Sequence, residues 1–259
     1  MWSREVARIR LVLISHIHAD HHVGLVGILE ARLRLGLTDP LCIVGPPSLE
    51  HSLEELRAPL GLLYTYYVNL HLLSAASPRP TARPPAPTVV AQESLRKAMD
   101  ATGIDRVEAV CVPHCFNAFA YVVRTRGGRS VVFSGDTRPS EDLARAGQGA
   151  DVLLHEATFE HDMVAEARKK MHSTTVEALE VADRMGATDV VLNHFSQRYP
   201  KLPVSASASS RRAVMVAFDL MCLPLDKVGA VAQFLPAIRC VLEEEEEEEE
   251  SKASAPPKE

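Results

Sequence analysis

The chain contains 259 residues, 46% of them hydrophobic, with 28 lysines and arginines against 34 aspartates and glutamates. This composition can fill one sizeable core, and no apolar run approaches the roughly 18 residues that a membrane-spanning helix requires, so we expect no membrane partner. Eight of the acidic residues form a glutamate run at 243–250, and the rest of the chain is mildly basic, which permits binding to RNA without requiring it.

The first predicted strand, 11–14, leads into a histidine-rich segment at 15–22 with the sequence SHIHADHH. Imidazole nitrogens and carboxylate oxygens together suit zinc, and ligands at these spacings can diverge enough to serve two neighbouring ions. The alternative is a polar loop that is rich in histidine by chance, but four of the 11 histidines fall within seven positions here. The potential ligands are His16, His18, Asp20 and His21.

A helix is predicted directly after this loop, over 23–35, because Val26, Leu29 and Leu33 recur at helical spacing and a glycine follows. Its N-terminus would face the predicted metal site, where the helix dipole favours an anionic phosphate. Further along the chain, the proline-rich segment 77–87 is predicted to be a stiff surface connector.

Four later apolar runs, at 107–112, 131–133, 152–154 and 190–192, are predicted to be buried strands. Each is followed by a residue that can ligate metal or move a proton, and in α/β architectures the chemistry collects at the carboxyl ends of strands. Taken singly, each of these residues could equally be a packed polar group or a turn aspartate. Their shared position after a strand predicts that they converge. They are His114, Asp136, His155, Glu156 and His194.

A second helix is predicted over 174–186, where Thr174 and Glu177 fit a capping box. This places His172 on the loop that enters the helix. The apolar stripe of the helix is expected at Val176, Leu179 and Ala182.

We expect one domain over 1–241 and an acidic disordered tail over 242–259, in which the glutamates form a low-complexity extension or repel competing polyanions. Five scattered cysteines without C-x-x-C spacing indicate a reducing compartment. Cys115 either neighbours the predicted ligands or packs in the core. The first residues have neither the apolar core of a signal peptide nor a clear transit peptide, so we expect no targeting segment in this chain.

Six short motifs, in order and spacing, resemble those of the ribonuclease Z family, zinc phosphodiesterases of the metallo-β-lactamase superfamily that process the 3′ ends of tRNA. The first motif alone indicates only the superfamily, whereas the last three are narrower. The final motif and the acidic tail are most similar to the C-terminal half of the long animal form. The motifs are HIHADH at 16–21, PHC at 113–115, SGDT at 134–137, HEAT at 155–158, HST at 172–174 and NHFSQRY at 193–199.

The resemblance implies an α/β fold, the αββα sandwich of the superfamily, which we expect to be N-terminally truncated because the family places several strands before the first motif. It also implies two Zn²⁺ ions. By resemblance, one ion would be held by His16, His18 and His114, and the other by Asp20, His21 and His194, with Asp136 bridging them.

The resemblance assigns proton transfer to three residues. Asp20 would accept a proton from the attacking water, and Glu156 would orient His172 to donate a proton to the departing 3′ oxygen. The alternative for Glu156 is a carboxylate that only orients a ligand histidine. Arg198 is either a phosphate contact or a surface arginine.

The implied function is a zinc-dependent endoribonuclease that removes 3′ trailers from precursor tRNA in the mitochondrion and nucleus, as a monomer and without a DNA partner. One alternative is a catalytically silent fragment that binds RNA or a partner. Another is a hydrolase of thioesters or lactams, which the HEAT, HST and NHFSQRY motifs disfavour. Because part of one sheet and the family's tRNA-gripping arm would be absent, we expect the isolated chain to be poorly stable and to cleave RNA slowly.

Overall fold

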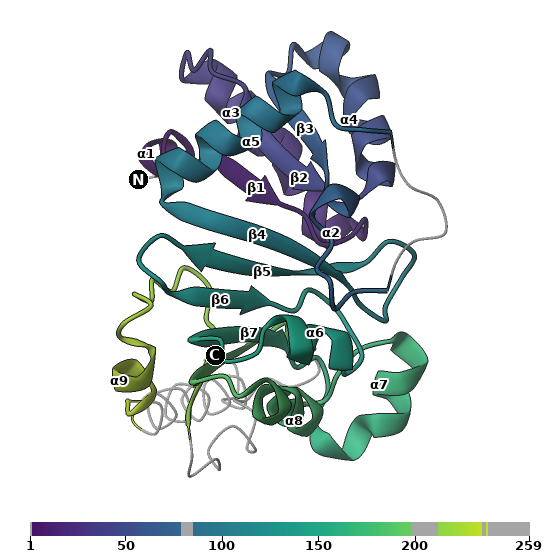
Figure 1. The fold of residues 1–259 in the computed structure, drawn as a ribbon, viewed down its shortest axis with the longest axis vertical. Helices are drawn as coiled ribbons and strands as arrows, with labels where there is room; N and C mark the ends of the chain where they lie inside the picture. The colour runs from purple at the N-terminus through teal and green to yellow at the C-terminus, as the bar shows by residue number, and fades with distance from the viewer. Residues whose placement is uncertain (1, 79–84, 198–211, 235–236, 238–259) are drawn as a thin grey trace, which may run out of the picture.

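The computed structural model describes residues 2–78, 85–197, 212–234 and 237, which form two β-sheets enclosed by helices (Figure 1). The smaller sheet is parallel, in the order β1-β2-β3, and the larger has the order β4-β5-β6-β7-β8-β9. The small-sheet strands are β1 (Leu11–Leu13), β2 (Leu41–Gly45) and β3 (Tyr64–Val68). The large-sheet strands are β4 (Ile104–Cys111), β5 (Phe119–Thr125), β6 (Ser130–Phe133), β7 (Val152–Glu156), β8 (Asp189–Asn193) and β9 (Ala213–Val216).

The two sheets pack face to face between outer helices. Helices α3 (Gly24–Arg34) and α4 (Pro47–Leu60) bury apolar side chains against one face of the small sheet. Its other face packs on β4, β5 and helix α5 (Val89–Thr102). Helices α6 (Glu141–Ala146) and α8 (Thr175–Met185) cover the outer face of the large sheet. The order helix, sheet, sheet, helix confirms the αββα architecture that was expected.

The remaining helices are short. Two of them flank the predicted site, namely α2, which contains Asp20 and His21, and α7, which ends just before His172. No described helix is long and apolar enough to cross a membrane. Their bounds are α1 (Trp2–Val6), α2 (Ala19–His22), α7 (Val164–Lys170) and α9 (Val228–Ala232), with 3-10 turns η1 (Asn69–Leu72) and η2 (His161–Met163).

The predicted strands and both predicted helices are present, with bounds shifted by one to three residues. The apolar stripe predicted for α8 is wrong in part, because Val176 is 41% exposed and the buried face is lined by Ala178, Val181 and Met185 as well as Ala182. The packed face therefore combines two alanines with the larger Val181 and Met185. Part of the segment 77–87, Arg198 and the acidic tail lie outside the described residues.

Tyr121 joins the two sheets next to the predicted site. Its hydroxyl donates to the carbonyl oxygen of Ile14, 2.7 Å away at the end of β1, and accepts from the side-chain amide of Asn69 at 3.2 Å. The backbone N–H of Phe119 adds a bond to the carbonyl of Ser15 at 3.0 Å. The chain entering the histidine-rich segment is therefore fixed to both sheets.

Candidate metal centre

Five strands bring their carboxyl ends to one edge of the sandwich. Strand β4 runs parallel to β6, β7 and β8 because two antiparallel pairings separate it from β6, and β1 ends beside β5 across the sheet interface. All seven side chains predicted as metal ligands lie at this edge, within a few ångströms of one another. His22, in contrast, turns away to the carbonyl of Ile17.

The first group contains His16, His18 and His114. Both His16 Nε2 and His114 Nε2 lie 3.1 Å from His18 Nδ1. His114 Nδ1 donates to the carbonyl oxygen of Met171 at 2.8 Å, which leaves Nε2 unprotonated and directed at the group. Three nitrogen atoms from two distant loops thus converge on one point.

The second group contains Asp20, His21 and His194. Asp20 Oδ2 lies 3.5 Å from His21 Nε2 and 3.9 Å from His194 Nε2. Asp136 Oδ2 lies between the groups, 3.6 Å from His16 Nε2, 3.2 Å from His21 Nε2 and 3.6 Å from His194 Nε2. A single carboxylate oxygen therefore faces both groups.

These residues fit metal ions. Ligand atoms at the corners of a tetrahedron around zinc lie about 3.3 Å apart, close to the spacings seen here. His21 Nε2 is buried, and no described group makes a hydrogen bond to it with acceptable geometry, which is costly unless a cation accepts its lone pair. The donor set of imidazole nitrogens and carboxylates is one that zinc prefers.

The protonation states also suit cations. Burial and the charge of His21 lower the pKa of His16 to about 3, so this imidazole is neutral and able to ligate at neutral pH. Burial opposes ionisation of Asp136, but the close approach of His21 Nε2 at 3.2 Å and the neighbouring histidines outweigh it and lower the pKa of this carboxyl. The centre thus offers a charged carboxylate among imidazoles.

Two backbone features shape the loops. Gly135 has φ 56°, and a Cβ there would lie 2.9 Å from Ser15 Cβ, so the glycine lets the Asp136 loop approach the end of β1. His194 has φ 59° directly after β8. A left-handed conformation at a non-glycine residue costs about 1–2 kcal/mol and is typical of functional positions.

Glu156 and His172 form a buried pair at the rim of the centre. Glu156 is 1% exposed, and its Oε1 lies 2.9 Å from both His172 Nδ1 and the backbone N of Thr137, which donate to it. Burial alone would lower the pKa of His172, but the hydrogen bond to Glu156 outweighs it and raises the pKa. The His172 ring stacks on that of His194 with centroids 5.4 Å apart. This geometry favours an imidazolium next to the two groups of candidate metal ligands.

Sequence reasoning gave no role to Thr158, which connects the pair to the second group. Its hydroxyl donates to Glu156 Oε2 at 2.7 Å and lies 2.8 Å from His194 Nδ1. The available signal was its place in the HEAT motif. His155 of the same motif is buried on the opposite side of β7, where its Nδ1 donates to the carbonyl of Glu156, and it does not join the centre. Cys115 Sγ lies within 4.8 Å of the first group's nitrogens.

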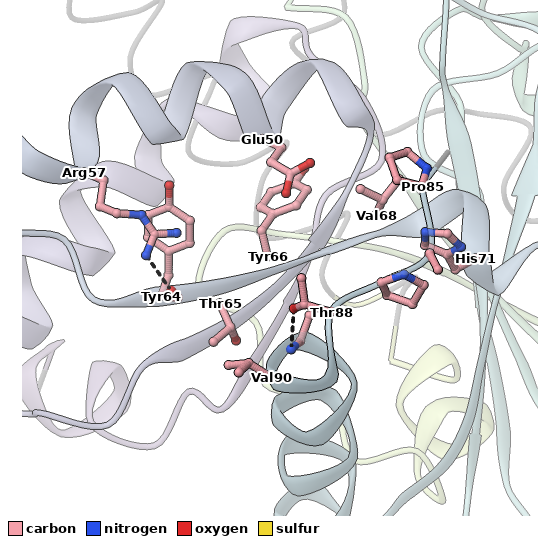
Figure 2. A pocket seen from close by; sticks show the side chains of 13 residues that line it. Glu50, Arg57, Tyr64, Thr65, Tyr66, Val68, His71, Pro85, Thr88 and Val90 are labelled. Atoms are coloured by element: carbon pink, nitrogen blue, oxygen red, sulfur yellow. Dashed lines mark hydrogen bonds between the residues drawn. The ribbon is translucent and has the colours of Figure 1, made fainter. Parts of the chain in front are cut away.

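A cavity of about 380 Å³ opens beside the centre, lined by Asp136 and His194 and by apolar side chains of Leu13, Phe133 and Leu154. A second hollow, of about 390 Å³, lies at β3 and the start of α5 (Figure 2). There the Arg57 guanidinium stacks on the Tyr64 ring, 3.9 Å from its centroid, and donates to the Tyr64 carbonyl. None of the seven convergent residues lines this second hollow.

Comparison with known proteins places this chain in a family. A model of the β-lactamase superfamily domain matches residues 2–195. The chain is 37% identical over 231 residues to ribonuclease Z 1 of Schizosaccharomyces pombe and 33% identical over 246 residues to the mitochondrial ribonuclease Z of Drosophila melanogaster. These matches cover 89% and 92% of this chain but 28% and 30% of those proteins, so the chain spans less than a third of their length.

Solved structures give the same picture. A long-form ribonuclease Z from yeast has a TM-score of 0.77 and 25% identity, covering 92% of this chain and 35% of the other. The human short-form tRNase Z has a TM-score of 0.60 and 23% identity, covering 85% and 80%. The second likeness concerns the fold alone.

Proposed function

Since this chain belongs to the β-lactamase superfamily, we propose that its metal centre hydrolyses phosphodiester bonds in RNA and that it removes the 3′ trailer from precursor tRNA. The observation that carries this proposal is the arrangement of seven ligand-type side chains in two groups around Asp136, with the Glu156–His172 pair beside them. The names of the relatives, ribonuclease Z and tRNase Z, supply the substrate class.

In this proposal His16, His18 and His114 would hold one zinc ion, Asp20, His21 and His194 would hold a second, and the Asp136 carboxylate would serve both. Zinc would lower the pKa of a bound water from about 15.7 toward about 7 and offset the negative charge that builds on the phosphate.

The protein's own groups move the protons. The side chain of Asp20 is 70% exposed, next to His21, and in this proposal its carboxylate accepts a proton from the attacking water. His172 donates a proton to the departing 3′ oxygen, and Glu156 keeps the imidazole protonated and oriented. In the alternative role, Glu156 takes no part in proton transfer and only orients His194, through the hydroxyl of Thr158.

We further propose that precursor tRNA is the partner, that the chain acts as a monomer, and that no DNA is bound. The relatives from Drosophila and Arabidopsis are named mitochondrial, which supports action in the mitochondrion. Action in the nucleus remains a prediction from the sequence resemblance.

The test is an assay of the purified, zinc-loaded chain on a precursor tRNA transcript with a 3′ trailer, with metal content measured on the same sample. We expect a tRNA product with a 3′ hydroxyl, formed slowly by the chain alone. Zinc binding and RNA binding without cleavage would support the silent fragment instead, and hydrolysis of a thioester or lactam in place of RNA would overturn the proposal.

A further inference from the structure

His172 is held by its backbone as well as by its ring. A guanidinium N–H of Arg138 donates to the carbonyl oxygen of His172. The preceding carbonyl, of Met171, accepts from His114 Nδ1 at 2.8 Å. The two peptide groups that flank the His172 Cα are therefore bonded to two loops of the centre, those of Arg138 and His114. These bonds fix the direction in which the imidazole leaves the backbone.

Arg138 is itself held in place. Its two terminal nitrogens donate to the two carboxylate oxygens of Glu177, one of them at 2.8 Å. Glu177 completes the capping box of α8 by accepting from the backbone N of Thr174 at 2.9 Å. The Arg138 backbone N–H donates to the carbonyl of Pro113 at 2.8 Å. Arg138 thus joins the loop of Asp136, the loop of His114 and the start of α8.

The charge of this arginine is already compensated. The side chains of Arg138 and Glu177 are 14% and 15% exposed, and a planar fork that pairs with a carboxylate is a geometry that lysine cannot reproduce. With both terminal nitrogens engaged inside the protein, the guanidinium has a structural partner rather than a substrate phosphate.

We propose that Arg138, oriented by Glu177, is a positioning residue that fixes the backbone of His172 and so aims its imidazole at the departing oxygen of the substrate. This inference rests on the proposed function of His172 as a proton donor. It predicts a loss that depends on the leaving group, because only a poor leaving group needs a donated proton.

The test compares two substrates in the zinc-loaded chain and its R138M variant. Precursor tRNA releases a sugar oxygen, whereas bis(p-nitrophenyl) phosphate releases p-nitrophenolate, which departs without a proton. We expect R138M to lower kcat on the tRNA roughly 10-fold, which is less than the full contribution of a general acid because the imidazole is misdirected but still present. The KM for the tRNA should stay within about 2-fold of the wild-type value. Hydrolysis of bis(p-nitrophenyl) phosphate should change less than about 2-fold, and R138K should recover only part of the loss because it lacks the fork.

The matched control is R184M, which removes the ion pair between Arg184 of α8, the helix that also carries Glu177, and Glu141 of α6. R184M should hydrolyse both substrates at the wild-type rate. If R138M lowered kcat equally on both substrates, or on neither, the positioning role would be overturned. If R138M does not fold, R138K carries the same comparison.

A readout independent of RNA cleavage separates this inference from the proposed function. Hydrogen–deuterium exchange of the peptide spanning 171–174 should accelerate in R138M and stay unchanged in R184M, at equal zinc content. If the wild-type chain hydrolyses the activated diester but no RNA, the proposed function fails, and unchanged exchange in R138M would separately overturn the positioning role.

Discussion

Asp136 is the residue on which both groups of the metal centre depend. Its buried side chain is 4% exposed and offers one oxygen to His16, His21 and His194 at 3.2–3.6 Å. The exposed Asp20, in contrast, contacts only the second group, which leaves it free for a second task.

We predict that Asp20→Asn separates these two tasks. The amide keeps the shape and one oxygen ligand but cannot accept a proton, so cleavage should fall by roughly two to four orders of magnitude, the range of general acid–base catalysis. Zinc content should fall much less. Metal analysis and single-turnover cleavage on the same preparation measure both, and an equal loss of metal and activity would leave Asp20 only a ligand role.

His114→Ala should remove the first metal ion selectively. His114 is the only first-group ligand that comes from the large sheet, and His16 and His18 alone do not complete a tetrahedral site. Zinc content should fall from about two to about one per chain, with loss of cleavage. His51→Ala is the control, because the His51 side chain is 83% exposed on α4 and contacts Glu55. Retention of both ions in His114→Ala would exclude His114 from the ligand set.

At the level of elements, α8 depends on a charged cap that responds to pH. Burial opposes ionisation of Glu177, but hydrogen bonds from Arg138 and from the Thr174 backbone outweigh it, and the pKa lies below the ordinary value of 4.5. A depressed carboxyl pKa contributes stability that is present above the ordinary pKa and is lost as pH falls through the folded-state pKa.

Glu177→Gln should therefore destabilise the chain in a pH-dependent way. At about pH 7 the free energy of unfolding should fall by about 1.5–3 kcal/mol, the value of a hydrogen bond to a charged group. The deficit should begin to shrink as pH falls below the ordinary value of 4.5 and disappear once pH falls through the lowered folded-state pKa, where the wild-type carboxyl is protonated too. Urea unfolding across this range measures it. Glu141→Gln, at a pair whose glutamate is 62% exposed, should cost less than about 0.5 kcal/mol at any pH, and a pH-independent deficit in Glu177→Gln would contradict the argument.

Sequence alone could predict the strands that end in a candidate ligand. It could not predict the strands and side chains that hold those ligands in place without being ligands themselves. The strands before His16, His114, Asp136 and His194 are short β-branched runs that end in a metal-binding residue, so local pattern and position agree. Strand β2 is equally buried, yet it ends in Gly45 and carries no such marker. The contacts of Arg138 join residues 34 and 39 positions apart, and no local pattern records them.

For the whole molecule, the centre exists only where two separate sheets meet. The small sheet supplies His16, His18, Asp20 and His21, and the large sheet supplies His114, Asp136 and His194, so the spacing of the side chains within each group depends on how the sheets are registered. Few polar contacts set that register. The hydroxyl of Tyr121 is one of them, buried between the Ile14 carbonyl and the Asn69 amide.

Tyr121→Phe should therefore weaken both stability and metal binding. It keeps the apolar ring but leaves the Ile14 carbonyl and the fully buried Asn69 amide unpaired, at a cost of about 1–3 kcal/mol in the free energy of unfolding. Because Ile14 lies two residues before His16, zinc affinity of the folded chain should fall as well. Tyr64→Phe provides the control, since that hydroxyl bonds to Glu54, whose side chain is 60% exposed and can be solvated instead. Urea unfolding with matched m-values and zinc titration measure the two effects. If Tyr121→Phe lost stability but bound zinc with unchanged affinity, the register of the sheets would not be what brings the side chains of each group together.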